Sequence, residues 1–134
     1  MIYLDARALV KFIRREEHTE ALRAWRLALP DGIDLVSSAL AELEISRTLV
    51  RAGTDHQRVP YLARQALRGI YLADLTTAVL ARATSYRVPK LGSLDALHLA
   101  TADPFRAELT EFVTYNRELL AAATQIGLPA SAPS

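Results

Sequence analysis

The chain has 134 residues, of which 51% are hydrophobic, and this is enough for one domain with a buried core. A formal net charge of +1 argues against a polycation, and the absence of cysteine excludes disulfides and thiolate zinc sites. No apolar run approaches the roughly 18–20 residues of a membrane-spanning helix, and the first residues do not resemble a secretory signal. We therefore expect a single-domain cytoplasmic protein with no membrane partner.

The first predicted element is a short buried strand at 2–4, which ends at the carboxylate of Asp5 and is followed at once by a helical pattern. Ser93 and Asn116 are predicted to cap later helices, and Pro60 suits a first helical turn. Periodicity and turn residues predict further helices at 19–29, 39–51, 56–68, 76–86, 93–102 and 116–126, and strands at 34–38, 70–75, 111–115 and 128–132. This alternation predicts an α/β fold with a mostly parallel central sheet of about five strands and helices on both faces.

Three acids, Asp5, Glu44 and Asp95, lie at or just beyond predicted switches from strand to helix. In a parallel α/β sheet these switches meet at the carboxyl edge, where ligands bind. Clustered carboxylates repel each other unless a cation neutralises them, and ligands that are all oxygen suit Mg²⁺ or Mn²⁺. The pattern therefore predicts a divalent metal site suited to phosphodiester chemistry.

Each of these acids also has a purely structural interpretation. Helix capping alone can explain an aspartate at a helix start, such as Asp5 or Asp95. Glu44 can be a solvent-exposed residue on the surface of its helix. Glu42 competes with Glu44, because positions two apart on a helix point about 200° apart and only one can face a cleft. His98 lies one turn after Asp95 and could be a metal ligand or a general base. Its apolar neighbours favour the alternative, a hydrogen-bonded and half-buried histidine.

Four segments of the chain together form a recognisable pattern. They are Ile2-Tyr3-Leu4-Asp5 followed by Ala8-Leu9-Val10-Lys11, Ser37-Ser38-Ala39-Leu40 leading to Glu44, the block from Ser93 to Ala102, and Phe112-Val113-Thr114-Tyr115-Asn116-Arg117. In this order and at this spacing they resemble the PIN-domain ribonucleases, specifically the VapC toxins of bacterial VapBC toxin–antitoxin pairs. The resemblance covers nearly the full length.

The resemblance implies one PIN domain over residues 1–134 and an Mg²⁺-dependent endoribonuclease that cleaves structured RNA, with Mn²⁺ as a substitute ion. Asp5, Glu44 and Asp95 would then be catalytic and metal-binding, and the match favours Glu44 over Glu42. Asn116 would be a further metal ligand. The implied partners are a VapB-like antitoxin, which inserts a segment into the acidic groove, and a second copy of the chain in a homodimer.

Five basic residues are candidates for contacts with the RNA backbone: Arg7, Lys11, Arg14, Arg47 and Arg51. Arginine binds phosphate with a planar two-point fork, and the last two follow Glu44 at helical spacing. The alternative is a solvated basic face. RNA binding of this kind should weaken with salt.

Two positions depart from the family pattern. Asn116 stands where an acid is usual, so the cluster loses a charge, and this would weaken a second metal site more than the first. Arg7 stands where Ser or Thr is usual, and it can contact an RNA phosphate or pair with Glu44 in place of a metal. These changes leave open a degenerate PIN-fold module that binds antitoxin or RNA with little or no cleavage. A metal-dependent phosphatase is a third interpretation, disfavoured because Arg7 stands where enzymes that form an aspartyl-phosphate often carry a second aspartate.

Overall fold

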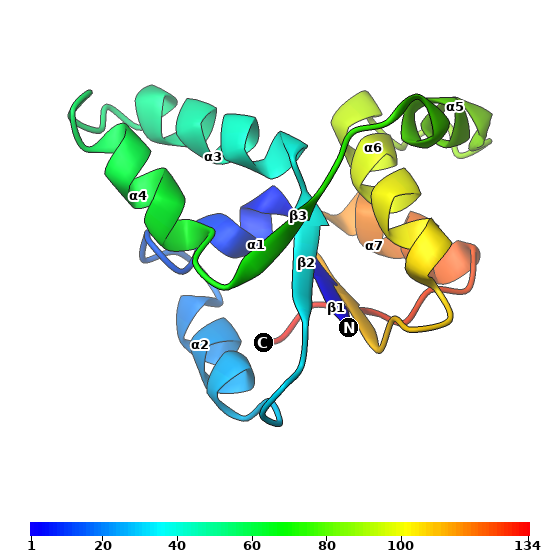
Figure 1. Ribbon diagram of the computed structural model, residues 1–134, viewed down its shortest axis with the longest axis horizontal. Coiled ribbons are helices and arrows are strands. Elements are labelled where there is room, and N and C mark those ends of the chain that lie inside the picture. Colours follow the sequence, from blue (N-terminus) through cyan, green and yellow to red (C-terminus); the bar gives the residue numbers. More distant parts are fainter.

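The central feature of the computed structural model, which describes all 134 residues, is a five-stranded sheet. The strands are ordered β3-β2-β1-β4-β5, and every neighbouring pair is parallel. Figure 1 shows the edge strand β3 in front of β2 and β1. In chain order the strands are β1 (Ile2–Leu4), β2 (Leu35–Ser38), β3 (Ile70–Ala73), β4 (Glu111–Val113) and β5 (Ala130–Ser131).

Seven helices cover the two faces of this sheet. They are α1 (Ala6–Val10), α2 (Thr19–Leu27), α3 (Leu40–Arg51), α4 (Val59–Ala66), α5 (Thr77–Ser85), α6 (Ser93–Ala102) and α7 (Arg117–Gln125), and a short 3₁₀ helix, η1 (Asp103–Phe105), follows α6. In Figure 1, α1 to α4 lie on one side of the strands and α5 to α7 on the other. The predicted α/β fold is therefore confirmed, and the sheet is wholly rather than mostly parallel. None of the helices combines the length and apolar character needed to cross a membrane.

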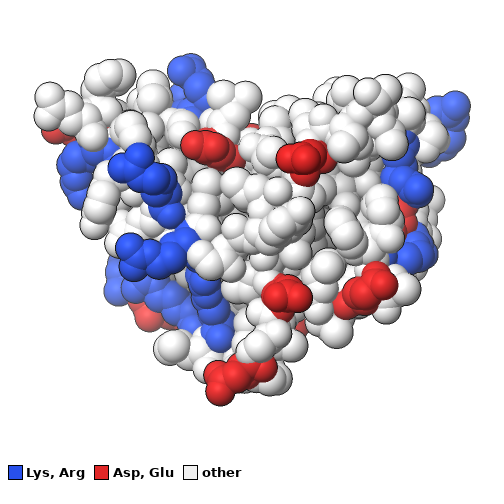
Figure 2. Space-filling view, viewed as in Figure 1, with Lys and Arg blue, Asp and Glu red and all other residues white.

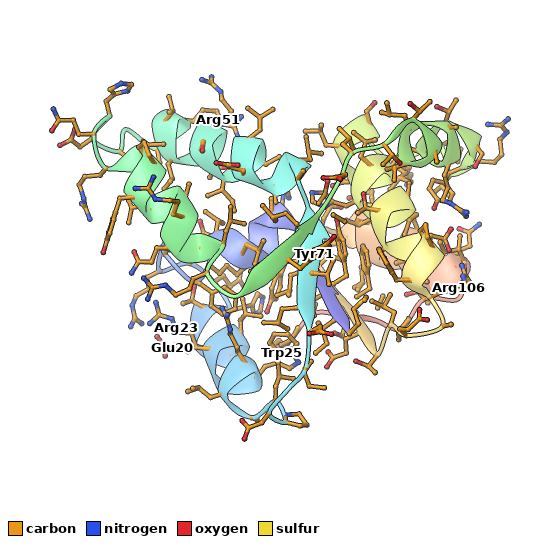
Figure 3. The ribbon with its side chains drawn as sticks, in the orientation of Figure 1. Glu20, Arg23, Trp25, Arg51, Tyr71 and Arg106 are labelled. Carbon is orange, nitrogen blue, oxygen red and sulfur yellow. The ribbon has the colours of Figure 1, made fainter.

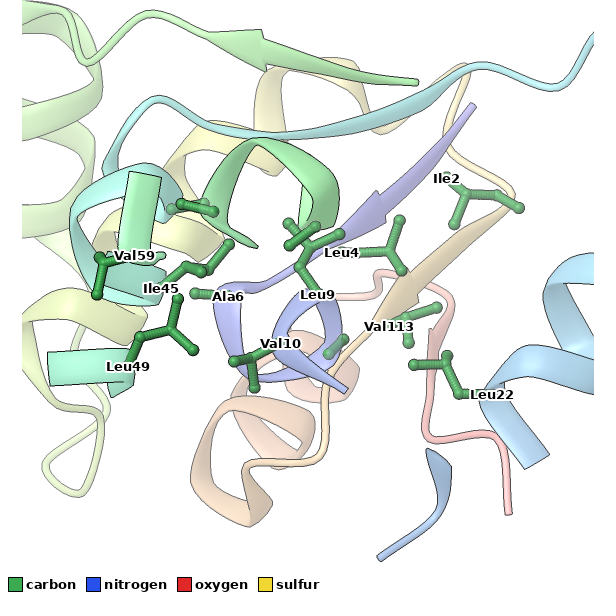
Figure 4. Packing of buried hydrophobic residues seen from close by; sticks show 14 residues of the cluster. Ile2, Leu4, Ala6, Leu9, Val10, Leu22, Ile45, Leu49, Val59 and Val113 are labelled. Atoms are coloured by element: carbon green, nitrogen blue, oxygen red, sulfur yellow. The ribbon is translucent and has the colours of Figure 1, made fainter. Parts of the chain in front are cut away.

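The core is divided by the sheet into two clusters, because successive side chains of a strand point to opposite faces. Ile2 and Leu4 of β1 pack with residues of α1, α2, α3 and α4, as Figure 4 shows for Leu9 and Ile45. Tyr3 points to the other face and packs with residues of α6 and α7. Both faces of β1 are thus buried, which places its carboxyl end inside the molecule.

Local signals account for some helix boundaries, and side-chain caps occur at the starts of α1, α5 and α7. Asn116 caps α7 as predicted, since its side-chain oxygen accepts a hydrogen bond from the amide of Leu119. The helix predicted at 56–68 is shorter, and Pro60 lies in its first turn. The prediction that Ser93 caps α6 is wrong: Gly92 is the N-cap, and Ser93 is already the first helical residue. A cap needs an extended backbone, and Gly92 adopts it one residue earlier.

Candidate functional site

Asp5 is fixed at the carboxyl end of the central strand. Its backbone is extended, and its carboxylate caps α1 by accepting a hydrogen bond from the amide of Ala8 at 2.9 Å. The other carboxylate oxygen accepts a hydrogen bond from the hydroxyl of Thr114, which directly follows β4. Because Asp5 is only 2% exposed, these two donors hold it rigidly. The capping interpretation is correct for Asp5, yet the buried carboxylate forms no ion pair with a basic side chain.

The second and third acids come from helices that flank this point. Glu44 lies in the second turn of α3, and Asp95 lies in the first turn of α6. The amide nitrogen of Asn116 donates a hydrogen bond to Asp95 at 2.9 Å, while the amide oxygen of Asn116 caps α7. The structure thus turns the nitrogen of Asn116, rather than its oxygen, toward the acid.

His98 connects the acidic edge to the core. Its Nε2 lies 2.6 Å from Oε1 of Glu44, and its Nδ1 lies 2.7 Å from the hydroxyl of Tyr3. The side chain is 1% exposed, so it is fully rather than half buried. Its position one turn after Asp95 was a usable signal, but the sequence does not reveal that the partner is Glu44 on a different helix.

The charges of these groups act on one another. Burial raises the pKa of Asp5, although the positive charge of His98 and the hydrogen bonds from Thr114 and Ala8 oppose this shift. Burial also raises the pKa of Asp95, and so do the negative charges of Asp5 and Glu44. The structure therefore brings the three predicted acids within electrostatic reach of each other. Holding all of them ionised costs free energy that a bound cation would remove.

The chemistry of the donors fits a hard divalent cation, because carboxylate oxygens are the ligands that Mg²⁺ and Mn²⁺ prefer. In this structure, however, no three His, Asp or Glu side chains converge closely enough to hold an ion. Each acid instead accepts a hydrogen bond from the protein: Asp5 from Ala8 and Thr114, Glu44 from His98, and Asp95 from Asn116.

A cleft of about 830 Å³ opens beside this edge. Glu44 lines it, whereas Glu42, Asp5 and Asp95 are not part of the lining. Glu42 is exposed on the surface of α3. The geometry therefore answers the question that helical spacing left open: Glu44, not Glu42, faces the cleft.

The predicted RNA-contacting residues divide into two groups. Arg7, Arg47 and Arg51 line the cleft and form no ion pair with an acid of the chain. Figure 3 labels Arg51 on α3, and Figure 2 shows other basic side chains gathered on the side of α2 and α4. The folded-back pairing of Arg7 with Glu44 does not occur.

The other two basic residues are less available. Lys11 also lines the cleft, but it is only 8% exposed, and its Nζ lies 3.3 Å from Glu16 and 4.9 Å from the centre of the Tyr115 ring. Arg14 is not part of the lining, and it lies 3.6 Å from the same Glu16. Their charges are thus partly neutralised within the protein.

Comparison with known proteins gives one consistent result. The PIN domain family model matches residues 2–125. The chain is 37% identical over 134 residues to Ribonuclease VapC47 of Mycobacterium tuberculosis, and this covers 99% of the chain and 97% of that protein.

Two solved structures are similar in fold. A toxin–antitoxin complex from Klebsiella pneumoniae matches with a TM-score of 0.70 and 21% identity, covering 100% of this chain and 98% of the other. The crystal structure of Mycobacterium tuberculosis VapC20, a sarcin–ricin loop cleaving toxin, matches with a TM-score of 0.73 and 13% identity, covering 91% of this chain and 95% of the other.

Proposed function

The chain belongs to the PIN-domain family, and we propose that it is the ribonuclease toxin of a toxin–antitoxin pair, cleaving structured RNA in an Mg²⁺-dependent reaction. The observation that carries this proposal is the group of Asp5, Glu44 and Asp95, whose charges interact at the carboxyl edge of the sheet. Full-length similarity to a protein named as a ribonuclease supports the same activity.

Asp5, Glu44 and Asp95 would hold the metal ion. When bound, Mg²⁺ or Mn²⁺ would neutralise charge that develops on the phosphate and lower the pKa of an attacking water. The raised pKa values of Asp5 and Asp95 support this assignment, because carboxylates whose ionised form is disfavoured by burial and by like charges gain from a bound cation.

The remaining residues position the acids and the substrate. Thr114 and Ala8 each donate a hydrogen bond to one oxygen of Asp5, so the orientation of this carboxylate is already fixed. Arg47 and Arg51 line the cleft on the same helix as Glu44, where they would hold RNA phosphates beside the acids. Arg7 would contribute a further contact, and its charge already lowers the pKa of Asp95.

The proposed partner is an antitoxin that occupies the cleft and keeps RNA out of it. One of the similar structures is a toxin–antitoxin complex, which supports this partner. A segment with basic residues would complement Glu44 and the adjoining acids. We also propose a cytoplasmic homodimer, with exposed Leu80 of α5 as a candidate contact.

A degenerate binding module is the second candidate, and one contact favours it. The amide nitrogen of Asn116 donates to Asp95 at 2.9 Å and so occupies one oxygen of a proposed metal ligand. An acid at position 116 would instead add a negative charge. In this alternative the protein binds RNA or antitoxin but cleaves little or not at all.

The deciding experiment incubates purified, partner-free protein with total cellular RNA in Mg²⁺, in Mn²⁺ and in chelator. Asp5→Asn is the matched control, because asparagine keeps the shape of the side chain and removes its charge. We expect discrete metal-dependent cuts that disappear in the variant. Metal-independent RNA binding without products would support the binding module and overturn the nuclease.

A further inference from the structure

A buried chain of hydrogen bonds runs from the core of the sheet to the cleft. It begins at Tyr3 on β1, passes through His98 on α6 and ends at Glu44 on α3. Tyr3 and His98 are each 1% exposed, whereas the side chain of Glu44 is 20% exposed in the cleft wall. This series of hydrogen bonds therefore connects a fixed position in the core to a proposed metal ligand.

Tyr3 is held in place by its neighbours. Its ring stacks on Phe112 with centroids 5.2 Å apart and planes 2° apart, and it meets the His98 ring edge-on at 5.8 Å. Tyr3 and Phe112 lie on paired positions of β1 and β4. The hydroxyl of Tyr3 is thus presented to His98 by the sheet itself.

The hydrogen bond to Glu44 is available in either charge state of His98. In the neutral ring, a hydrogen bond donated by Tyr3 to Nδ1 leaves the proton on Nε2, which then donates to Glu44. In the protonated ring, Nε2 donates in the same way and Nδ1 donates to Tyr3.

We infer that His98 and Tyr3 are positioning residues that fix Oε1 of Glu44 and so present its other oxygen to a divalent ion. His98 donates to Oε1, so Oε2 of Glu44 carries no hydrogen bond from the protein and is available to a ligand. Without this donor, the long glutamate side chain would sample several rotamers and lose entropy on binding. The inference rests on the proposed function, because it requires Glu44 to be a metal ligand.

The test measures the affinity of the RNA-free protein for Mn²⁺, by calorimetry and by the paramagnetic resonance signal of the free ion. His98→Leu removes the donor, and we expect the dissociation constant to rise about tenfold or more, as is usual when a group that orients a metal ligand is lost. Tyr3→Phe removes only one hydroxyl and should cause a smaller rise. His98→Gln keeps an N–H near the position of Nε2 and should restore most of the affinity.

Controls separate positioning from a general effect on folding. Melting temperatures of all variants are measured, and His56→Leu, at an exposed histidine, should leave Mn²⁺ affinity unchanged. If His98 were only a packing residue, the loss of Mn²⁺ affinity in each variant would follow its loss of melting temperature, and His98→Gln would not restore Mn²⁺ affinity. That result would overturn the inference. Tyr3→Phe and His98→Gln keep the test decisive if His98→Leu does not fold.

A double variant distinguishes this inference from the proposed function. If His98 acts through Glu44, then His98→Leu should have no further effect on Mn²⁺ affinity in a Glu44→Gln background. A further loss in that background would overturn the positioning role. If Glu44→Gln alone leaves Mn²⁺ binding unchanged, the proposed metal site itself is wrong. If Glu44→Gln weakens binding but His98→Leu does not, only the inference fails.

Discussion

Replacing Asp103 with asparagine should destabilise the protein by loosening helix α5. Asp103 is 7% exposed, and Arg106 donates to its Oδ1 through Nε at 3.0 Å and Nη2 at 2.6 Å. Tyr86 and Arg82 donate to its Oδ2 at 2.9 and 3.3 Å. Helix α5 contains Arg82, is followed by Tyr86 as its C-cap, and has no buried residue of its own. These two bonds are therefore the polar anchor of its C-terminal end, across from Arg106, which Figure 3 labels.

The size of the effect follows from these contacts. Asparagine keeps one acceptor oxygen and loses the charge, so part of this network disappears. Hydrogen bonds to charged groups contribute about 1.5–3 kcal/mol each, but the Arg82 and Arg106 side chains are nearly half exposed, and solvent screens them. We expect a loss of about 2 kcal/mol in the free energy of unfolding. With an unfolding entropy of about 2.1 cal/mol/K per residue, this lowers the Tm by about 7 °C.

The same carboxylate predicts a dependence on pH. Burial alone would raise the pKa of Asp103, but the hydrogen bonds from Arg106 and Tyr86 and the charges of Arg106 and Arg82 outweigh it and hold the pKa below the ordinary 3.8. The stabilisation is therefore complete above pH 3.8 and is lost as the pH falls through the lower, folded-state value. The difference in the free energy of unfolding between wild type and Asp103→Asn should therefore become smaller at acidic pH.

Thermal and urea unfolding, followed by circular dichroism at neutral pH and at several acidic values, provide the measurement. Arg87→Gln is a suitable control, because Arg87 is exposed and bonds only the backbone of Thr84. Equal melting temperatures for wild type and Asp103→Asn at neutral pH would refute the reasoning. So would a difference that persists undiminished in acid.

Three further predictions concern the proposed metal and RNA sites. Mn²⁺ at about 100 times its dissociation constant should raise the free energy of unfolding of the wild type by about 2.7 kcal/mol, and Asp5→Asn should lose most of this stabilisation. Equal stabilisation of both proteins by Mn²⁺ in thermal unfolding would exclude Asp5 as a ligand. Asn116→Asp should tighten Mn²⁺ binding and lower the Tm of the metal-free protein, because it adds a charge to an acidic cluster; weaker Mn²⁺ binding by titration calorimetry would contradict this. Arg47→Ala or Arg51→Ala should weaken the binding of a labelled RNA and reduce the salt dependence of the affinity by about one counterion each. Arg14→Ala should have little effect on RNA affinity, because Arg14 lies outside the cleft. An equal loss of RNA affinity in all three variants would favour a solvated basic face.

Local sequence signals predicted the fold well, because they report on interactions within an element. A short continuous apolar run predicted a buried β1, and helical apolar patterns predicted the helices on both faces. The short polar side chain of Asn116 predicted the cap of α7. The error at Ser93 shows that such signals locate a helix start only to within about one residue. Serine and glycine are both accepted at the N-cap, so Gly92 can take the position predicted for Ser93.

Contacts between elements could not be predicted in the same way. The bond between His98 and Glu44 depends on how closely α6 and α3 approach across the sheet edge, and no periodicity records that distance. The burial of Lys11 depends likewise on Glu16 and on the ring of Tyr115, which follow from loop packing. Residue type and helical face were enough to nominate the acids, but not to identify which neighbours hold them.

The order of these residues along the chain also affects how the protein is made. Asp5 and Tyr3 leave the ribosome first, but their partners Thr114 and His98 lie 109 and 95 residues further along. Strand β1 must wait for β4 before its second edge is paired, and such long-range parallel pairing is slow. A nascent chain therefore displays Asp5 without the neighbours that orient it. The proposed metal site is therefore assembled only when synthesis of the chain is nearly complete.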